Sequence, residues 1–344
     1  MQMVFPRAAV SATVGRSRPL ARRGAFALEP VEMLPRLAER IGHLAERALE
    51  PNPFFLPEFL QPALLALGRK GVKLATFSDR EDLRFFAPVR VLGGKVLGRP
   101  RLTTWTHPYA PLGSPLIDRE TADPVADGLL DHMKTSGRTL FSFPELPLGG
   151  PAAMALRACA ERRGFWTEAA RQMRPILVPE GDGAGAFEQM VTQKRRRELE
   201  RQLRKLSEAG AVSHMSARSA SDVEAAFGMF IALEASGWKG RRGSALQGSA
   251  AIHDFARSAV ARLAQQGRAA IDVLRVGDRP VAALIRLDHA GLSIPWKIAY
   301  DEAFATLSPG KQLMCDETRR WLGDPAIRRV DPVCDENNPL MASL

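Results

Sequence analysis

A short loop of small and basic residues has the composition of an anion-binding site. Residues 308–312 (SPGKQ) lie between an apolar run that is typical of a strand and a segment that is typical of a helix. A helix N-terminus carries partial positive charge and unpaired N–H groups, which favour phosphate. Gly310 has no Cβ to keep a ligand from its backbone, and Lys311 adds a positive charge. We therefore expect a phosphate-bearing ligand at this loop.

Two blocks of mixed elements are expected to position this loop. The first should contain helices at 58–68, near 123–135 and at 150–163, and strands at 72–77, 83–91, 102–106, 139–143 and near 173–178. The second should contain helices at about 192–209, 221–235 and 251–266, an antiparallel meander of strands at 270–276, 281–287 and 292–300, and further strands near 212–216 and at 328–333. Tight connections between the meander strands favour antiparallel pairing. The fold class is therefore α+β (mixed α/β), with two similar, mostly antiparallel domains that suggest duplication.

The chain is long enough for two domains. It has 344 residues, and a single core rarely serves that length. The turn-rich run at 180–185 (EGDGAG) marks the boundary. We expect a disordered basic tail at 1–28, which resembles a transit peptide in composition, a first domain at 29–180 and a second at 181–344.

Charge and cysteine content narrow the class of protein. The net charge of +10 favours anionic partners, although the arginine-rich composition of proteins from a GC-rich genome explains it equally well. The three cysteines, Cys159, Cys315 and Cys334, have no metal-ligand or disulfide spacing. No apolar run is long enough for a membrane helix. We expect a cytoplasmic protein without a metal, whose oligomeric state the sequence leaves open.

Several short motifs occur in an order found in one known group of proteins. They are 107–113 (HPYAPLG), 234–240 (EASGWKG), 296–301 (WKIAYD) and 308–310 (SPG). In this order they resemble the GNAT acyltransferases associated with cellulose and exopolysaccharide biosynthesis, which are similar to FemAB-type proteins with two tandem GNAT folds. The resemblance is best over about 185–340.

The resemblance implies an acyl-CoA site in the second domain and a degenerate first domain. In GNAT folds the central strand splays from its neighbour, pantetheine pairs along it, and the pyrophosphate lies on the next loop. The implied strand is 292–300 and the implied loop is 308–312. The implied cofactor-binding residues are Ile298, Ala299, Ser308, Gly310, Lys311 and Gln312. The multi-glycine pattern usual in the pyrophosphate-binding loop of GNAT folds is reduced here to one glycine. An aminoacyl-tRNA is therefore an alternative acyl donor. The fold also implies a further helix and hairpin after 333, so the second domain is expected to be reduced or truncated.

Acyl transfer requires a base for the nucleophile and an acid for the leaving group. Tyr300 is the candidate acid, or else a core aromatic at the end of the strand. Asp301 is the candidate base, or else caps the turn. Asp331, like Asp335, could hold an acceptor amine or serve as a turn residue. Cys315 has no evident histidine partner and is expected in the core.

Three further side chains are candidates for binding the acceptor. Trp238 and Lys239 lie in a loop that flanks the acceptor cleft in the resembled fold. A tryptophan face stacks on sugars or cations, although a packing role is equally compatible. Lys297 interrupts an apolar strand and could contact a carboxylate or phosphate, or else lie on a solvated face.

The helix at 194–205 is the most basic segment. It could bind RNA, although interleaved glutamates also fit a solvated helix face. The leading expectation is an acyl-CoA-dependent N- or O-acetyltransferase acting on a sugar-containing or small acceptor. The alternatives are an aminoacyl-tRNA-dependent transferase and a non-catalytic protein that binds RNA or acyl-CoA.

Overall fold

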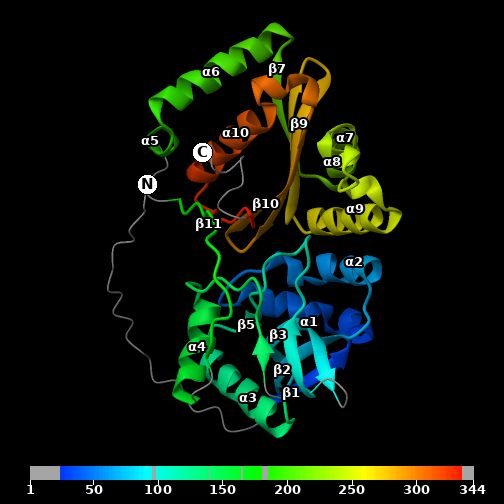
Figure 1. Ribbon diagram of the computed structural model, residues 1–344, viewed down its shortest axis with the longest axis vertical. Coiled ribbons are helices and arrows are strands. Elements are labelled where there is room, and N and C mark those ends of the chain that lie inside the picture. Colours follow the sequence, from blue (N-terminus) through cyan, green and yellow to red (C-terminus); the bar gives the residue numbers. More distant parts are fainter. Residues whose placement is uncertain (1–23, 95–97, 139, 164–165, 180–184, 335–344) are drawn as a thin grey trace.

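A computed structural model describes residues 24–94, 98–138, 140–163, 166–179 and 185–334. The chain forms two lobes, and each contains one sheet with helices on its faces (Figure 1). The predicted α+β class is confirmed.

The first sheet has the order β1-β2-β3-β4-β6, with the short β5 paired to β3. All pairs are antiparallel except β4 with β6. Its strands are β1 Gly24–Pro30, β2 Val72–Asp79, β3 Asp82–Gly94, β4 Gly98–Thr104, β5 Leu116–Ile117 and β6 Phe141–Ser142. Its helices are α1 Leu34–Glu46, α2 Pro57–Leu67, α3 Ala122–Thr135 and α4 Pro151–Arg163, with one-turn 3-10 helices at Val31–Met33 and Pro53–Phe55.

The second sheet has the order β11-β10-β9-β8-β7, and the predicted antiparallel meander is its centre. Its strands are β7 Val212–Ala217, β8 Ala269–Val276, β9 Arg279–His289, β10 Leu292–Tyr300 and β11 Arg329–Val330. Its helices are α5 Ala186–Met190, α6 Gln193–Glu208, α7 Ala220–Ser236, α8 Trp238–Arg241, α9 Ala250–Gln265 and α10 Pro309–Gly323, with 3-10 turns at Leu246–Gly248 and Glu302–Leu307.

The two lobes repeat one topology. In each, a strand is followed by helices, then by three antiparallel strands, a helix and a short strand that pairs in parallel with the last of the three; the first lobe adds the two-residue β5 before that helix. Thus β10, α10 and β11 correspond to β4, α3 and β6. This correspondence supports the duplication suggested by the sequence.

Several expectations about elements need correction. Residues 24–28, assigned to the tail, form part of β1 and pair with β2, because Phe26 and Leu28 alternate toward the core. The strand expected near 173–178 is only an isolated bridge between Leu177 and Val330. On α6, Leu199 and Leu206 are buried, whereas Leu203, which lies between them in sequence, is exposed. Residues 1–23, most of the linker at 180–184, and Asp335 lie outside the described residues.

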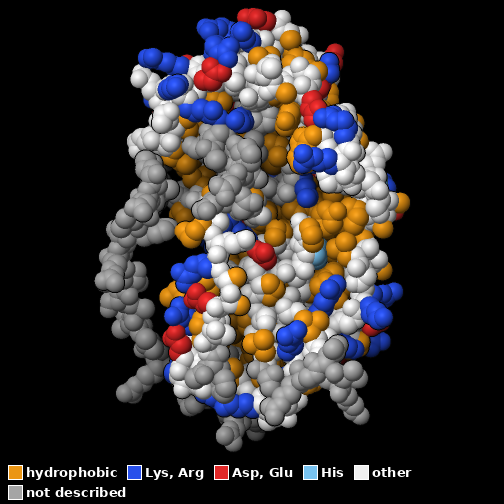
Figure 2. Space-filling view, in the orientation of Figure 1, with side chains coloured by type: hydrophobic (Ala, Val, Ile, Leu, Met, Phe, Trp, Pro, Cys, Tyr) orange, Lys and Arg blue, Asp and Glu red, His pale blue; other side chains and the backbone are white. Residues whose placement is uncertain are grey.

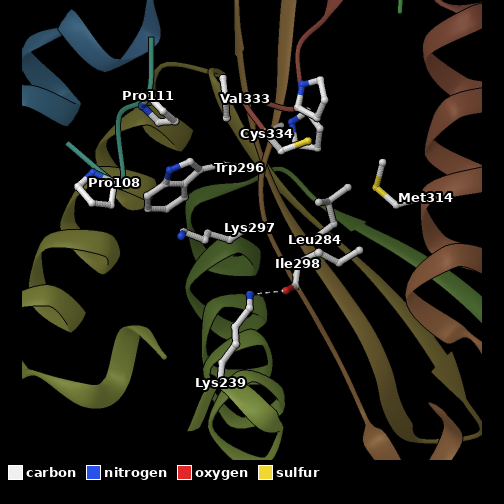
Figure 3. A pocket seen from close by; sticks show the side chains of 12 residues that line it. Pro108, Pro111, Lys239, Leu284, Trp296, Lys297, Ile298, Met314, Val333 and Cys334 are labelled. Carbon is white, nitrogen blue, oxygen red and sulfur yellow. Dashed lines mark hydrogen bonds between the residues drawn. The ribbon is translucent and has the colours of Figure 1, made fainter. Parts of the chain in front are cut away.

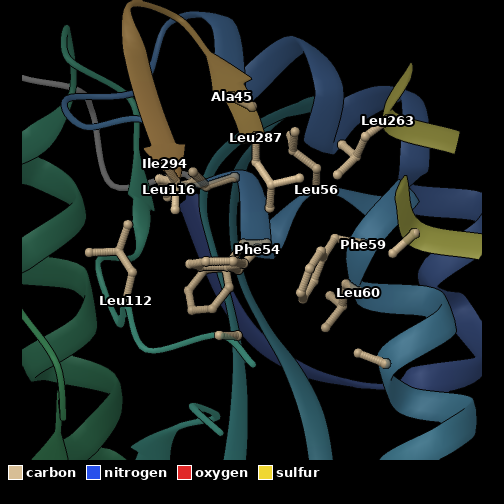
Figure 4. Packing of buried hydrophobic residues seen from close by; sticks show 14 of the residues in the cluster. Ala45, Phe54, Leu56, Phe59, Leu60, Leu112, Leu116, Leu263, Leu287 and Ile294 are labelled. Atoms are coloured by element: carbon tan, nitrogen blue, oxygen red, sulfur yellow. The ribbon is translucent and has the colours of Figure 1, made fainter. Parts of the chain in front are cut away.

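One hydrophobic core crosses the junction between the lobes (Figure 4). Helix α2 packs on α9, and Phe59 lies edge-on to Phe255 and Trp296 with ring centroids 5.3 and 5.7 Å away. Across the same junction, Trp296 Nε1 donates a hydrogen bond to Tyr109 O at 2.8 Å. The first lobe is therefore fixed against β10, the strand that carries the predicted site.

Candidate functional site

A cavity of about 210 Å³ lies where β10 meets the first lobe (Figure 3). Its wall is built from both lobes and from the segment after β11. The lining residues are Pro108, Pro111, Lys239, Leu284, Pro295, Trp296, Lys297, Ile298, Met314, Pro332, Val333 and Cys334. The predicted motifs at 107–113, 238–239 and 296–298 therefore meet in space.

Strand β10 has an open edge beside this cavity. It pairs with β11 only through Leu292 and Ser293, and no other described strand pairs with that edge. Asp301 N–H bonds to Val281 O on β9, so alternation directs the backbone groups of Ile298 and Tyr300 to the open edge. The structure thus contains the splayed central strand that the sequence resemblance implied.

Lys239 holds one of the groups on this edge. Its Nζ donates to Ile298 O at 2.9 Å and to Glu234 Oε1 at 3.2 Å (Figure 3). Glu234 is buried and also accepts the N–H of Leu246 at 2.7 Å. With its carbonyl occupied, Ile298 keeps its N–H, which points to the same edge, for a ligand.

Lys297 is the unpaired amine of the cavity. Its Nζ forms no hydrogen bond or ion pair with any described residue and lies 5.0 Å from the ring centre of Tyr109 and 5.9 Å from that of Trp296. Burial and the positive charge of Lys239 lower the pKa of Lys297 to about 8, and Glu234 opposes this shift. A substantial neutral fraction near neutral pH gives this amine the properties of a general base.

The N-terminus of α10 carries positive charge but few available N–H groups. The N–H groups of Lys311 and Gln312 both bond to Ser308 O, and Ser308 N–H bonds to Ala305 O. Pro309 has no N–H, so the Gly310 N–H is the one backbone donor of residues 308–312 that remains available to a ligand. The expectation of a loop with several exposed donors is therefore corrected.

Positive side chains supply the rest of the charge at this helix end. Burial and the neighbouring charge of Arg195, on α6, lower the pKa of Lys311. The two cations therefore lie close enough to interact, and an anion between them would relieve their repulsion.

Comparisons with known proteins identify the second lobe. Residues 193–338 match the family model described as an acetyltransferase (GNAT) domain. By this match, the C-terminal lobe is similar to GNAT acetyltransferase domains. No curated protein sequence matches the chain significantly.

Two solved structures share the fold of both lobes. FemX is 9% identical to this chain; the superposition covers 88% of this chain and 89% of FemX and gives a TM-score of 0.56. A conserved protein of unknown function from Bacteroides thetaiotaomicron VPI-5482 is 10% identical, covers 93% of this chain and 95% of its own, and gives a TM-score of 0.52. The chain therefore consists of two tandem GNAT-like domains.

The three predicted catalytic residues do not converge. Asp331 N–H bonds to Ser293 O at the start of β10, whereas Tyr300 and Asp301 lie at its end. At ~3.3 Å per residue, these positions are roughly 20 Å apart along the strand. Tyr300 packs toward Gly310 of α10 and does not line the cavity. The three residues thus cannot act together on one carbonyl.

Both aspartates have structural partners. Asp301 accepts the N–H of Ala303 at 3.0 Å and pairs with Arg279 at 2.5 Å, which matches the capping alternative. Asp331 is buried, accepts the N–H of Val333 at 2.9 Å, and pairs with Arg329 at 3.1 Å and Arg174 at 3.5 Å. It therefore anchors the segment that forms one wall of the cavity.

Two predicted cofactor residues are committed to packing. Gln312 is buried and donates from Nε2 to Leu199 O at 2.9 Å, which ties α10 to α6. Ala299 is buried against β9, where it pairs with Ala283. A Cβ built on Gly310 would lie 3.4 Å from the Tyr300 ring, so Gly310 packs closely on β10. Cys315 is buried as expected, and burial raises its pKa to about 11.

Helix α8 forms the outer side of the cleft. Trp238 is 42% exposed, with the Arg242 guanidinium 5.2 Å from its ring centre. Glu302 fixes this helix by accepting Trp238 N–H at 2.6 Å and pairing with Arg241 at 2.7 Å. Trp238 thus remains accessible to a ligand, whereas Lys239 points inward.

Two residues of the site, Glu234 and Tyr109, were not predicted from the sequence. Glu234, at the start of the EASGWKG motif, orients Lys239, and Tyr109, within HPYAPLG, covers Lys297. Both lie inside motifs that the sequence analysis had singled out. The neighbouring His107 is half-buried, and its burial together with the charge of Arg90 lowers its pKa to about 4, so it is neutral at neutral pH.

A second charged cluster lies between the sheet and α10, and none of its residues lines the cavity. Ligand atoms of His214, Asp272 and Glu317 lie within 4.8 Å of one another, the spacing of a metal site. Arg286 Nε lies 3.2 Å from Asp272, and Arg320 Nη1 lies 3.2 Å from Glu317. Because arginines already supply positive charge, the cluster fits a buried ion-pair network that fastens α10 to the sheet.

The surface over α6 is rich in Lys and Arg (Figure 2). On this helix Arg201 pairs with Glu198 at 2.6 Å, one of the interleaved glutamates. None of the described helices is long and apolar enough to cross a membrane.

Proposed function

We propose that the GNAT domain transfers an acyl group, in the simplest case acetyl from acetyl-CoA, to an amine or hydroxyl group of a small or sugar-containing acceptor. The observation that carries the proposal is the open edge of β10, which runs beside a cavity containing the unpaired Lys297. Donor and acceptor would then meet at Ile298 in a ternary complex.

Each part of the reaction has a group suited to it. The Ile298 N–H would donate to the thioester oxygen and to the oxyanion that forms as the acceptor attacks. Neutral Lys297 would take the proton from the attacking amine or hydroxyl. Tyr300, two residues along the same edge, remains the proposed proton donor to the leaving thiolate.

Lys311 and Arg195 would bind the donor phosphates. Their proximity at the N-terminus of α10 supplies positive charge where the loop supplies few N–H donors. A single available N–H binds pyrophosphate weakly. Aminoacyl-tRNA therefore remains a second candidate donor, and it would contact the basic face of α6. A role in polysaccharide biosynthesis stays a proposal drawn from the sequence resemblance.

Calorimetric titration with acetyl-CoA tests the proposed donor. We expect Lys311→Glu to weaken binding at least ~10-fold, because a charged hydrogen bond contributes about 1.5–3 kcal/mol. The matched control is Lys205→Glu, an exposed residue about 15 Å further along α6 than Arg195. Its binding should stay close to wild type. Absence of binding to the wild-type protein would refute acetyl-CoA as donor and direct the titration to aminoacyl-tRNA.

A further inference from the structure

Lys297 lies where the nucleophile of an acceptor must come. It belongs to β10 one residue before Ile298, whose N–H faces the open edge, and its amine projects into the cavity (Figure 3). Its Nζ has no hydrogen-bond or ion-pair partner among the described residues. A neutral primary amine at this place could attack the thioester as an acceptor does, as well as act as a base.

We propose that Lys297 is itself acylated by the bound acyl-CoA when no acceptor fills the cavity. This inference rests on the proposed function, since the donor on β10 supplies the acyl group. Lys297 is then a site of self-modification in the transferase.

The chemistry is the ordinary aminolysis of a thioester. The lone pair of neutral Nζ attacks the carbonyl carbon, and the tetrahedral oxyanion receives the Ile298 N–H. The C–N bond forms as the C–S bond breaks. Coenzyme A leaves as the thiolate and takes up the proton that the nitrogen releases, so the products are an N-acyl-lysine and the free thiol.

The surroundings of Lys297 favour this amine over other lysines. At pH 7, an amine with a pKa near 8 is neutral in about 10% of molecules, roughly 300-fold more often than a lysine with the ordinary value of 10.5. Lys239 on α8 lowers this pKa and Glu234 on α7 raises it. The Tyr109 ring from the first lobe lies over the amine, and Cys334 lines the same cavity.

Lys239 provides an internal comparison. It lines the same cavity, but its Nζ is held by Glu234 and Ile298 O. Proximity to the donor alone would acylate both lysines. Acylation that depends on a free, partly neutral amine would select Lys297.

Acylation would also switch the site off. An amide nitrogen carries no charge and does not act as a base at neutral pH, so acyl-Lys297 loses the proton-accepting role assigned above. The acyl group would fill part of a cavity of about 210 Å³. Donor without acceptor would thus inactivate the transferase.

The first experiment incubates the purified full chain with acetyl-CoA and follows acetylation by mass spectrometry of its peptides. We expect acetyl-Lys297 to form at least ten-fold faster than acetyl groups on Lys239 or on the exposed Lys70 and Lys205. Its rate should rise with pH and level off above about 8. Lys297→Arg, which retains the positive charge, should abolish this adduct.

A second experiment makes the outcome independent of the donor. Trace labelling with acetic anhydride reports amine reactivity without any bound coenzyme A. Selective labelling of Lys297 by the anhydride but not by acetyl-CoA, with no calorimetric binding, would show that the proposed donor fails while the amine is reactive. Selective labelling by neither reagent would refute the reactive amine itself.

Two other results would overturn the proposal. Acetylation spread over lysines in proportion to their exposure would show ordinary surface chemistry. An adduct on Cys334 that hydroxylamine removes would place the nucleophile on the thiol instead.

Discussion

Lys297 combines two costs that a stable protein usually avoids, partial burial of a charged side chain and lack of a hydrogen-bond or ion-pair partner among the described residues. Its lowered pKa shows that the folded chain disfavours the charged form. In the proposed reaction this same property provides a base near neutral pH. The residue therefore exchanges stability for reactivity, as functional sites often do.

Replacing Lys297 by Met should raise stability while abolishing acyl transfer. The pKa is about 8 in the folded chain and 10.5 for an ordinary lysine. Below pH 8 the wild type therefore bears the full cost of the buried charge, at most about 3 kcal/mol. That cost falls as the pH rises from 8 toward 10.5.

Urea unfolding of both proteins at pH 7 and pH 9.5 measures this difference. The advantage of Lys297→Met should shrink at the higher pH. An advantage that is absent at pH 7, or that is the same at both values, would show that Lys297 is not a buried unpaired charge.

At the scale of elements, the short helix α8 determines where Lys239 points. Gly240 permits this helix to fold back on the end of α7, because a Cβ there would lie 1.9 Å from Ala235 O. The position of Lys239, and with it the bond to Ile298 O, depends on this close approach.

Gly240→Ala should therefore destabilise the chain by about 1–3 kcal/mol, because the backbone must shift to admit the methyl group. Gly228→Ala is a matched control within α7, where an added Cβ meets nothing within 4 Å, and it should stabilise the chain by about 0.5–1 kcal/mol. Thermal unfolding of the two variants checks both signs. Equal effects would mean that α8 is not packed as described.

Sequence patterns predicted the elements of the second lobe more fully than its site. Alternation and turn residues located β8, β9 and β10, and a small-residue loop located the start of α10. Whether an individual side chain packs in the core or faces the site depends on contacts with residues distant in sequence, such as that of Gln312 with Leu199, and these contacts could not be predicted. Asp331 and Tyr300 were both catalytic candidates because sequence alone does not show that Asp331 lies beside the start of β10 and Tyr300 at its end.

At the scale of the molecule, the first lobe acts as part of the site. Its loop at 107–113 corresponds in the repeat to the connection between β10 and α10, yet it lines the cavity of the second lobe and bonds to Trp296. The shared core around Phe59 and Phe255 keeps this wall in place. A degenerate first domain, which the sequence resemblance implied, would fit a lobe that supplies a wall of the cleft.

Because the core is continuous, the two lobes should unfold together. Calorimetry should give a single transition whose van't Hoff and calorimetric enthalpies agree. Phe255→Ala should cost about 3–5 kcal/mol and lower the whole transition. Two separate transitions in the wild type, or a variant that shifts only part of the signal, would contradict a shared core.

The central claim is that the acyl donor lies along the open edge of β10. Hydrogen exchange of the full chain with and without saturating acetyl-CoA tests it most directly, because amides on an unpaired edge exchange readily until a ligand bonds to them. We expect slower exchange at Ile298, whose N–H faces that edge, with little change in β8, whose amides are already paired. Binding of acetyl-CoA that leaves Ile298 unprotected, or no protection anywhere, would contradict it.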